Sequence, residues 1–331
     1  MESHGPHPYS QFLQSEDWAQ FQESYGRKVL RVSTEYGIVS AIRYPLPLGF
    51  SYWFIPRGPS LHGTISACDA HDHFLALAET IHANDPRAVF VRMEPTTEIT
   101  GDTWKAVRAA CSAGGARLVQ HIHPAVTRLI DLSLTESEIL KQMSDSTRRN
   151  ITVAAKRGVV VSEESSESGL DALWSILSQM SGRQKISLHE KKYYSHMLAT
   201  FSKEASPLGV SASIYVARFE NTPIAAGLIL RYAGVATYLH GASGDLHRDK
   251  KAQYALRWLV MTESKRHGCH TLDFFGENPP DPKDHDYRAA WQGFTLFKTG
   301  FGGTQIRLPG TFEYPIKPVL YTLYTTLKRF R

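Results

Sequence analysis

The 331-residue chain is poor in cysteine and has no long hydrophobic run, and each absence excludes a class of protein. Its three cysteines (Cys68, Cys111 and Cys269) are too widely spaced for a disulfide framework or a zinc pattern. No apolar run approaches the roughly 20 residues that a membrane-spanning helix needs. The stretch at 1–18 lacks the basic start and apolar core of a secretory signal. We therefore expect a folded protein that works in a reducing cytoplasm.

The charge balance of the chain is mildly basic. Charged residues make up 21% of the chain, hydrophobic residues make up 42%, and the formal net charge is +5. This excess suits polyanionic partners such as RNA, nucleotide diphosphates or an anionic membrane face, although many basic proteins bind none of them. The length allows two domains of ordinary size, each with its own core.

Hydrophobic patterns repeat in the same order in the two halves of the chain. Three strands, a helix and a further strand are predicted at 28–57, 72–85 and 88–95 in the first half, and at 210–243, 249–267 and 270–276 in the second. A strand, a crossover helix and a strand over about 35 residues imply a parallel pair of strands. The sequence thus predicts a mixed α/β (α+β) fold with a duplicated architecture.

A short helical pattern between the two halves carries a basic edge. It runs over 144–157 and places basic residues two turns apart, Arg148 with Lys156 and Arg149 with Arg157. A solvated helix face explains such a pattern as well as a surface for a polyanion does. Both interpretations stay open on the sequence.

One apolar stretch near the end of the chain contains a single lysine. In GFTLFKTGFGG (293–303) apolar and small residues alternate, so the pattern favours a strand that carries Lys298. From the residues alone, the simplest interpretation is a lysine at a strand end. Its stem would then cover Phe297 and Phe301 while its ammonium group reaches solvent.

Eight short motifs, in a consistent order, connect the chain to a known family. They are FLQSEDW (12–18), FIPRGPSL (54–61), VFVRMEP (89–95), TRLIDLS (127–133), STRRNITVAAKRGVVV (146–161), YLHGASGDLHR (238–248), LDFFG (272–276) and FKTGFGG (297–303). Together these motifs resemble the FemABX family. Its members are aminoacyl-tRNA-dependent transferases that add amino acids to the stem peptide of peptidoglycan precursors.

The resemblance implies two tandem GNAT-like (acyl-CoA N-acyltransferase-like) domains. Residues 1–134 and 306–331 would form the first domain, which binds the acceptor precursor. Residues 135–305 would form the second, with the tRNA side and the catalytic lysine. Only about 25 residues separate Arg183 from the strand expected at 210, without a heptad pattern. The chain is therefore similar to the shorter FemX-like members, which lack a coiled-coil arm.

The implied reaction is attack by an amine of the stem peptide on the aminoacyl ester at the 3′ end of tRNA. It needs a neutral amine, alignment and stabilisation of the tetrahedral oxyanion, but no covalent enzyme intermediate. The resemblance assigns the oxyanion to Lys298, and Gly302 and Gly303 would allow substrates to approach closely. Glu94 matches a carboxylate in the cleft of the first domain, where it would accept a proton or orient the amine. Pairing with Arg92 or capping of a loop are the alternatives.

The acceptor carries a diphosphate, so the resemblance implies cationic and aromatic contacts. Lys28 (or Arg27) occupies the region of a basic residue early in the first domain. In the second domain, His189 stands where the family has an arginine, with Tyr193 four residues on. This departure puts the phosphate contact in doubt, and Arg183 is one nearby residue that could replace it.

Further aromatic residues fall at the position of a tyrosine-x-tyrosine pair that lines the cleft of the family. They are Tyr238 and His240, and the alternative is that each packs in the core. His121 and His123 have no obvious third ligand and are interpreted as structural, so we expect no metal. The resemblance also implies no cofactor, with aminoacyl-tRNA as co-substrate, and we expect a monomer.

Two other functions stay open. A GNAT enzyme with an acyl-CoA donor would cradle the diphosphate with a glycine-containing turn at a helix N-terminus. The corresponding DLHRDKKAQY (245–254) has no glycine. The second alternative is a non-catalytic binder of tRNA or of the precursor.

The C-terminal PVLYTLYTTLKRFR (318–331) has an amphipathic helical pattern that ends in basic residues. It would either pack against the first domain or make a peripheral contact with the inner face of the membrane. Because cell-wall precursors are lipid-linked at some stage, both uses remain open.

Overall fold

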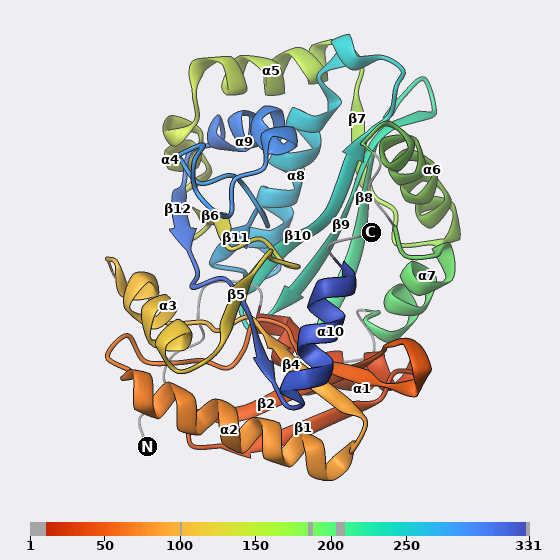
Figure 1. The fold of residues 1–331 in the computed structure, drawn as a ribbon. Coiled ribbons are helices and arrows are strands. Elements are labelled where there is room, and N and C mark those ends of the chain that lie inside the picture. The colour runs from red at the N-terminus through yellow and green to blue at the C-terminus, as the bar shows by residue number, and fades with distance from the viewer. Residues whose placement is uncertain (1–10, 100, 185–187, 203–208, 329–331) are drawn as a thin grey trace. The chain divides into compact units, whose positions relative to one another are not determined.

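The computed structural model describes residues 11–99, 101–184, 188–202 and 209–328, apart from the side chains of residues 183 and 184 (Figure 1). Its contacts group into two units. The N-terminal unit comprises the described residues of Leu13–Val126, Asn278–Ala289 and Ile306–Arg331, and the central unit comprises those of Thr127–Glu277, Ala290–Gln305 and Met1–Phe12. In the described chain, no helix combines the length and hydrophobicity needed to cross a bilayer.

The N-terminal unit is built on a six-stranded sheet. Its strands lie in the order β1 (Val29–Thr34), β2 (Gly37–Pro45), β3 (Ser51–Ile55), β4 (Ala88–Met93), β13 (Thr311–Pro315) and β5 (Arg117–Val119). β3 and β4 are parallel, as the intervening helix predicts, and the other neighbours are antiparallel. β13 lies between β4 and β5, so the C-terminal segment completes this sheet, as the resemblance implied.

Helices pack on both faces of this sheet (Figure 1). The helices of this part of the chain are η1 (Gln11–Gln14), α1 (Glu16–Ser24), η2 (Pro47–Gly49), α2 (Ala67–Asn84), α3 (Thr103–Ala113) and α10 (Pro318–Lys328). Val91 of β4 shares a core cluster with α2 and α3, whereas the adjacent Phe90 shares another with Tyr321 of α10. Because successive strand residues point to opposite faces, α10 lies across the sheet from α2 and α3.

The central unit repeats the arrangement on a seven-stranded sheet. Its strands lie in the order β12 (Thr304–Arg307), β6 (Val126–Asp131), β11 (Thr271–Asp273), β10 (Val235–Ser243), β9 (Thr222–Tyr232), β8 (Ser211–Phe219) and β7 (Val160–Glu163). Its helices are α4 (Glu136–Gln142), α5 (Asp145–Lys156), α6 (Glu167–Gln184), α7 (Lys191–Thr200), η3 (Arg248–Lys250), α8 (Ala252–Arg266), η4 (Ala289–Trp291) and α9 (Gln292–Thr299). β10 and β11, on either side of α8 in the chain, are parallel. The predicted mixed α/β fold with a repeated order of elements is confirmed.

Most of the stretch GFTLFKTGFGG is helical, so the predicted strand is wrong. It forms most of α9, which ends at its C-cap Gly300. Phe294, Phe297 and Phe301 are three and four residues apart, the spacing of one helix face. Phe297 packs against Tyr254 of α8 at a ring-centre distance of 4.9 Å. The alternation of apolar and small residues also fits a strand, and only this packing distinguishes the two.

The two units divide the chain at different places from the expected domain limits. Residues 127–134 group with the central unit, because β6 pairs within its sheet. Residues 278–289 group with the N-terminal unit, where Asp286 accepts hydrogen bonds from Arg108 at 2.7 Å and Arg307 at 3.1 Å. These long-range ion pairs have no signature in the local sequence.

A buried carboxylate, Asp85, connects α2 to two strands of the N-terminal sheet. Its Oδ2 accepts hydrogen bonds from Arg43 (2.7 Å), Ser51 (2.6 Å) and Trp53 (3.1 Å). Burial raises the pKa of Asp85, but the hydrogen bonds from Ser51, Arg43 and Trp53 outweigh burial and lower it to about 2. The ionised side chain therefore stabilises the folded state.

We expect Asp85→Asn to lower the free energy of unfolding at neutral pH by about 2 kcal/mol, the value of a carboxyl pKa lowered from 3.8 to about 2. Because the folded-state pKa is depressed, the stabilisation is present above the ordinary value of 3.8 and is lost as the pH falls to about 2. Urea unfolding at a series of pH values measures the difference. Asp72→Asn, at an exposed position of α2, is the control, and a difference that did not shrink in acid would contradict the prediction.

Candidate active site

Lys298 is buried in the central unit, where backbone carbonyls enclose its ammonium group. The residue is 6% exposed and lies in the last turn of α9. Its Nζ donates hydrogen bonds to the carbonyl of Phe275 at 2.8 Å and to that of Gly276. Both residues have left-handed φ values, 51° and 86°, in the turn that follows β11. The interpretation of a solvent-exposed lysine is therefore wrong.

A second buried cation, Arg257 of α8, acts electrostatically on Lys298. Its guanidinium carbon lies 4.3 Å from the ring centre of Tyr238 and 4.7 Å from that of Phe297. The two rings partly compensate the buried charge through cation–π contacts. Arg257 also donates a hydrogen bond to Gln253, but its Nε has no partner among the described residues. Sequence reasoning missed Arg257, because inside a helical pattern an inward arginine looks like an exposed one.

The surroundings tune the acidity of Lys298. Its pKa is lowered from 10.5 to about 7, chiefly by burial and then by the charge of Arg257, against the opposing effects of Asp273 and Glu277. Near neutral pH the side chain therefore exists both as an ammonium group and as a neutral amine. A buried group with such a strongly perturbed pKa is a candidate for a catalytic role.

Arg128 and two glycines hold the backbone near Lys298. Arg128 pairs with both carboxylate oxygens of Glu277, at 2.9 and 3.1 Å, and donates to the carbonyls of Gly302 and Gly303, each at 3.0 Å. The glycines have φ values of 79° and 71°. A Cβ on Gly302 would lie 2.6 Å from the carbonyl oxygen of Gln142. Close backbone packing therefore requires this glycine. Sequence reasoning missed Arg128 and Glu277. The only sequence signal for them is that each lies in or beside a motif that resembles the FemABX family.

Tyr238 of β10 lies directly over two glycines of the sheet. Gly227 and Gly241 are partners across β9 and β10, and a Cβ on either would collide with the Tyr238 ring or hydroxyl. Tyr238 is 4% exposed, and its hydroxyl has no hydrogen-bond partner in the described part of the chain. A buried, unsatisfied hydroxyl beside Arg257 is suited to a polar atom of a bound molecule.

Three of the predicted substrate-binding residues meet in one aromatic group. His189 stacks on Tyr193 at 4.1 Å between ring centres, and Tyr194 meets His240 edge-on at 5.4 Å. Tyr193 and Tyr194 are themselves in edge contact at 5.9 Å, and both are buried. The packing alternative therefore holds for Tyr193, while His240 is half-buried and His189 is exposed.

The structure shows less of the surroundings of Lys28 and Arg183, the two basic residues predicted to contact the acceptor. Lys28 is exposed immediately before β1. The neighbouring Arg27 lies over the ring of Tyr44, 5.3 Å from its centre. Arg183 belongs to α6, but its side chain lies outside the described residues.

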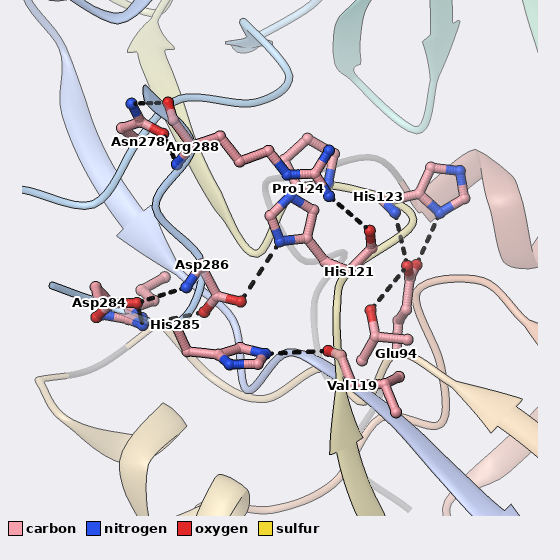
Figure 2. A network of polar contacts seen from close by, with 12 residues as sticks. Glu94, Val119, His121, His123, Pro124, Asn278, Asp284, His285, Asp286 and Arg288 are labelled. Atoms are coloured by element: carbon pink, nitrogen blue, oxygen red, sulfur yellow. Dashed lines mark hydrogen bonds and ion pairs between the residues drawn. The ribbon is translucent and has the colours of Figure 1, made fainter. Parts of the chain in front are cut away.

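Glu94 follows β4 in the N-terminal unit and is saturated with hydrogen bonds (Figure 2). It accepts from the backbone N–H and ring Nδ1 of His123 at 2.8 and 2.7 Å, and from Arg57 N and Thr311 Oγ1 at 3.3 Å each. Burial raises the pKa of Glu94, but His123, with a smaller contribution from Arg57, outweighs it and lowers the pKa to about 2. The alternative pairing with Arg92 is wrong.

Arg92 does not pair with Glu94 because it pairs with Glu313 of β13, whose carboxylate lies 2.9 Å from the Nε of Arg92. The other histidine of the HIHP stretch, His121, lies 3.4 Å from Asp286, and its carbonyl accepts from Arg288 at 3.0 Å (Figure 2). Within the described residues, no group of three or more histidine, cysteine, aspartate or glutamate side chains could hold a metal ion.

The basic edge of α5 separates into two kinds of residue. Arg148 donates to the carbonyls of Leu140 and Met143, at 3.2 and 2.6 Å, and so caps the end of α4. Arg157 donates to the carbonyl of Asp249. Arg149 and Lys156 are exposed, so these two are available to an outside anion.

A comparison with protein families decides where the chain belongs. The FemAB family model matches residues 105–217 and 211–329, more than half of the chain. The chain belongs to the FemAB family. The fold agrees with solved structures. The structure of FemX matches 96% of this FemAB chain and 95% of its own, with a TM-score of 0.74 at 16% identity. A tandem GNAT protein from the clavulanic acid biosynthesis pathway matches 85% and 79%, with a TM-score of 0.51 at 10% identity.

A relative found by sequence is similar to a shorter part of the chain. The lipid II:glycine glycyltransferase of Staphylococcus haemolyticus is 31% identical over 115 residues, which is 34% of this FemAB chain and 26% of that protein. The chain thus spans about a quarter of the length of the curated relatives it matches.

We expect Arg257→Met to raise the pKa of Lys298, because the substitution removes a neighbouring positive charge from a buried site. Competitive labelling of Lys298 with acetic anhydride over a range of pH, read by mass spectrometry, measures this pKa. Arg248→Met, at an exposed position, serves as the control. An unchanged or lowered pKa in Arg257→Met would show that Arg257 does not tune Lys298.

Proposed function

We propose that this FemAB chain is a tRNA-dependent aminoacyltransferase that adds an amino acid to the stem peptide of a peptidoglycan precursor. The observation that carries the proposal is the buried ammonium of Lys298, oriented by two carbonyls and with a pKa near 7. The acceptor would be a UDP-linked or lipid-linked sugar peptide. Lipid II in the name of the staphylococcal relative supports the second form.

In the proposed reaction, a neutral amine of the stem peptide attacks the ester carbonyl of aminoacyl-tRNA. A C–N bond forms, and the carbonyl oxygen becomes an oxyanion. The ester C–O bond then breaks, and the proton released by the amine ends on the 3′ oxygen of the departing tRNA. The ammonium of Lys298 has three N–H donors, of which Phe275 and Gly276 accept two. The remaining donor would stabilise the oxyanion, in a site where burial strengthens the interaction.

The two units would divide the substrates between them. The N-terminal unit would bind the acceptor, with Lys28 near its diphosphate. Glu94, with a pKa of about 2, is suited to orienting a group rather than accepting a proton. In the central unit, His189 and His240 would line the cleft beside Tyr238. We further propose a monomer that works in the cytoplasm, at the inner face of the membrane where its acceptor is lipid-linked.

The geometry at the start of α8 argues against the alternative of an acyl-CoA donor. A diphosphate cradle relies on close approach of backbone N–H groups at a helix N-terminus. Here Lys251 is the N-cap, with a left-handed φ of 61°, and His247 has a φ of 55°. Side chains thus occupy positions where a glycine turn would be needed. Binding of acetyl-CoA at micromolar affinity in calorimetry would favour the alternative.

We expect Lys298→Met to lower kcat for transfer by about 100- to 1,000-fold, the usual effect of removing one oxyanion donor. Binding of the precursor should change little, because the lysine is assigned to the transition state. Product formation by mass spectrometry and precursor binding by calorimetry test the two statements. Unchanged transfer would refute the oxyanion role, and transfer absent from the unsubstituted protein would favour the non-catalytic binder.

We expect the double substitution Arg149→Glu with Lys156→Glu to weaken binding of charged tRNA. It should also reduce the slope of log K against log salt by about two, since each lost phosphate contact removes roughly one unit. Binding assays at several salt concentrations measure the slope. Lys105→Glu with Lys283→Glu, at exposed positions of the N-terminal unit, makes the same change in net charge. An equal effect of the two pairs would exclude a specific role of α5.

A further inference from the structure

Helix α10 exposes an aliphatic ridge. Val319, Leu323 and Leu327 are 83%, 54% and 59% exposed. They are four residues apart, so they lie in one row along the helix. Burial of such side chains normally contributes to folding, and here three of them are left in water.

The opposite face of α10 is firmly attached to the N-terminal unit. Tyr321 donates a hydrogen bond to Glu313 of β13 at 2.7 Å. Phe90 of β4 meets Tyr321 and Tyr324 at ring-centre distances of 5.4 and 5.0 Å. The expected packing of this helix against the first domain is therefore present, and it uses the face that does not carry the ridge.

A further exposed leucine lies in the turn beside this helix. Leu48 is 90% exposed and has a left-handed φ of 60°, a conformation that costs free energy for a side chain of this kind. Its neighbours Leu46 and Phe50 pack against the same cluster as Leu320 and Tyr324 of α10. A leucine that is both strained and exposed does not help the fold, and its position suggests a use outside the molecule.

Basic residues surround these apolar side chains. Lys317 precedes α10, and Lys328 is exposed in its last turn. Arg87 is exposed and its side chain lies beside Gly49, in the turn of Leu48. The sequence continues with Arg329 and Arg331, and it has no acidic residue after Glu313. An apolar ridge with basic residues at both ends of its helix complements a surface with anionic headgroups above an apolar layer.

We propose that α10 and the turn at 46–50 form a docking surface for an anionic lipid bilayer. The ridge and Leu48 would enter the boundary between headgroups and acyl chains, while the basic residues contact the headgroups. A row of small aliphatic side chains on a convex helix offers no aromatic anchor or pocket, which a protein partner of ordinary affinity would need. For the biological role, the inference rests on the proposed function, since docking would bring the protein to a lipid-linked acceptor.

Co-sedimentation with vesicles tests the surface without tRNA or precursor, so its outcome is independent of the transferase activity. The full chain should bind vesicles of phosphatidylcholine with phosphatidylglycerol, and bind pure phosphatidylcholine weakly. Leu48→Ser with Leu323→Ser should lower the partition coefficient by about tenfold or more, because two leucines leave the bilayer. Ile38→Ser with Leu246→Ser, also at exposed positions, should leave it unchanged.

The proposal would be overturned if both double variants bound vesicles equally. It would also be overturned if the unsubstituted chain bound neither vesicle, or bound both vesicles equally. A concentration-dependent dimer in light scattering that Leu323→Ser abolishes would overturn it too, because a second copy would then cover the ridge. A transfer assay separates the two inferences. Leu48→Ser with Leu323→Ser should keep transfer to a soluble UDP-linked acceptor and lose it selectively on a vesicle-borne one. If the unsubstituted protein transfers to neither acceptor, the proposed function fails, while the sedimentation result still decides the docking surface.

Discussion

The burial of one ammonium group determines much of the central unit. A lysine taken out of water needs replacement hydrogen bonds, since an unpaired buried charge costs several kcal/mol. Two carbonyls provide them to Lys298, and both come from a left-handed turn after β11. That turn leads to Glu277, which Arg128 ties to the backbone of Gly302 and Gly303. The helix that carries the lysine, the turn that holds it and the glycine segment behind it are thus parts of one arrangement.

Two buried ionisable groups, one in each unit, both have a lowered pKa, but the consequences near neutral pH differ. The pKa of Lys298 moves towards neutrality, since burial and a second cation both disfavour its charge. The pKa of Glu94 moves away from neutrality, because His123 and Arg57 outweigh the effect of burial. A group that changes its protonation state near pH 7 can take part in proton-coupled chemistry, whereas one locked as an anion positions its neighbours. The contrast supports chemistry at the lysine and an organising role for the glutamate.

The end of the chain serves two purposes with one segment. β13 completes the N-terminal sheet, and α10 then crosses its face with Tyr321 and Tyr324 directed inward. The helix has a second apolar row, because Val319, Leu323 and Leu327 are four positions apart, and the side chains of this row are exposed. A helix fixed through one face presents the other in a defined orientation, which is what a docking surface requires.

The sequence by itself determined the repeated order of strands and helices in the two halves, the parallel pairs and the amphipathic C-terminal helix, because these follow from local hydrophobic periods. It also singled out Lys298 and Glu94, through motifs and not through chemistry. Tertiary structure decided the rest. Whether GFTLFKTGFGG is strand or helix depended on the packing of Phe297 against Tyr254. The partners of Lys298 come from residues 22 and 23 positions away, and Arg257 approaches it from another helix. Burial, pKa and ion pairing arise from such long-range contacts, and the local sequence carries no record of them.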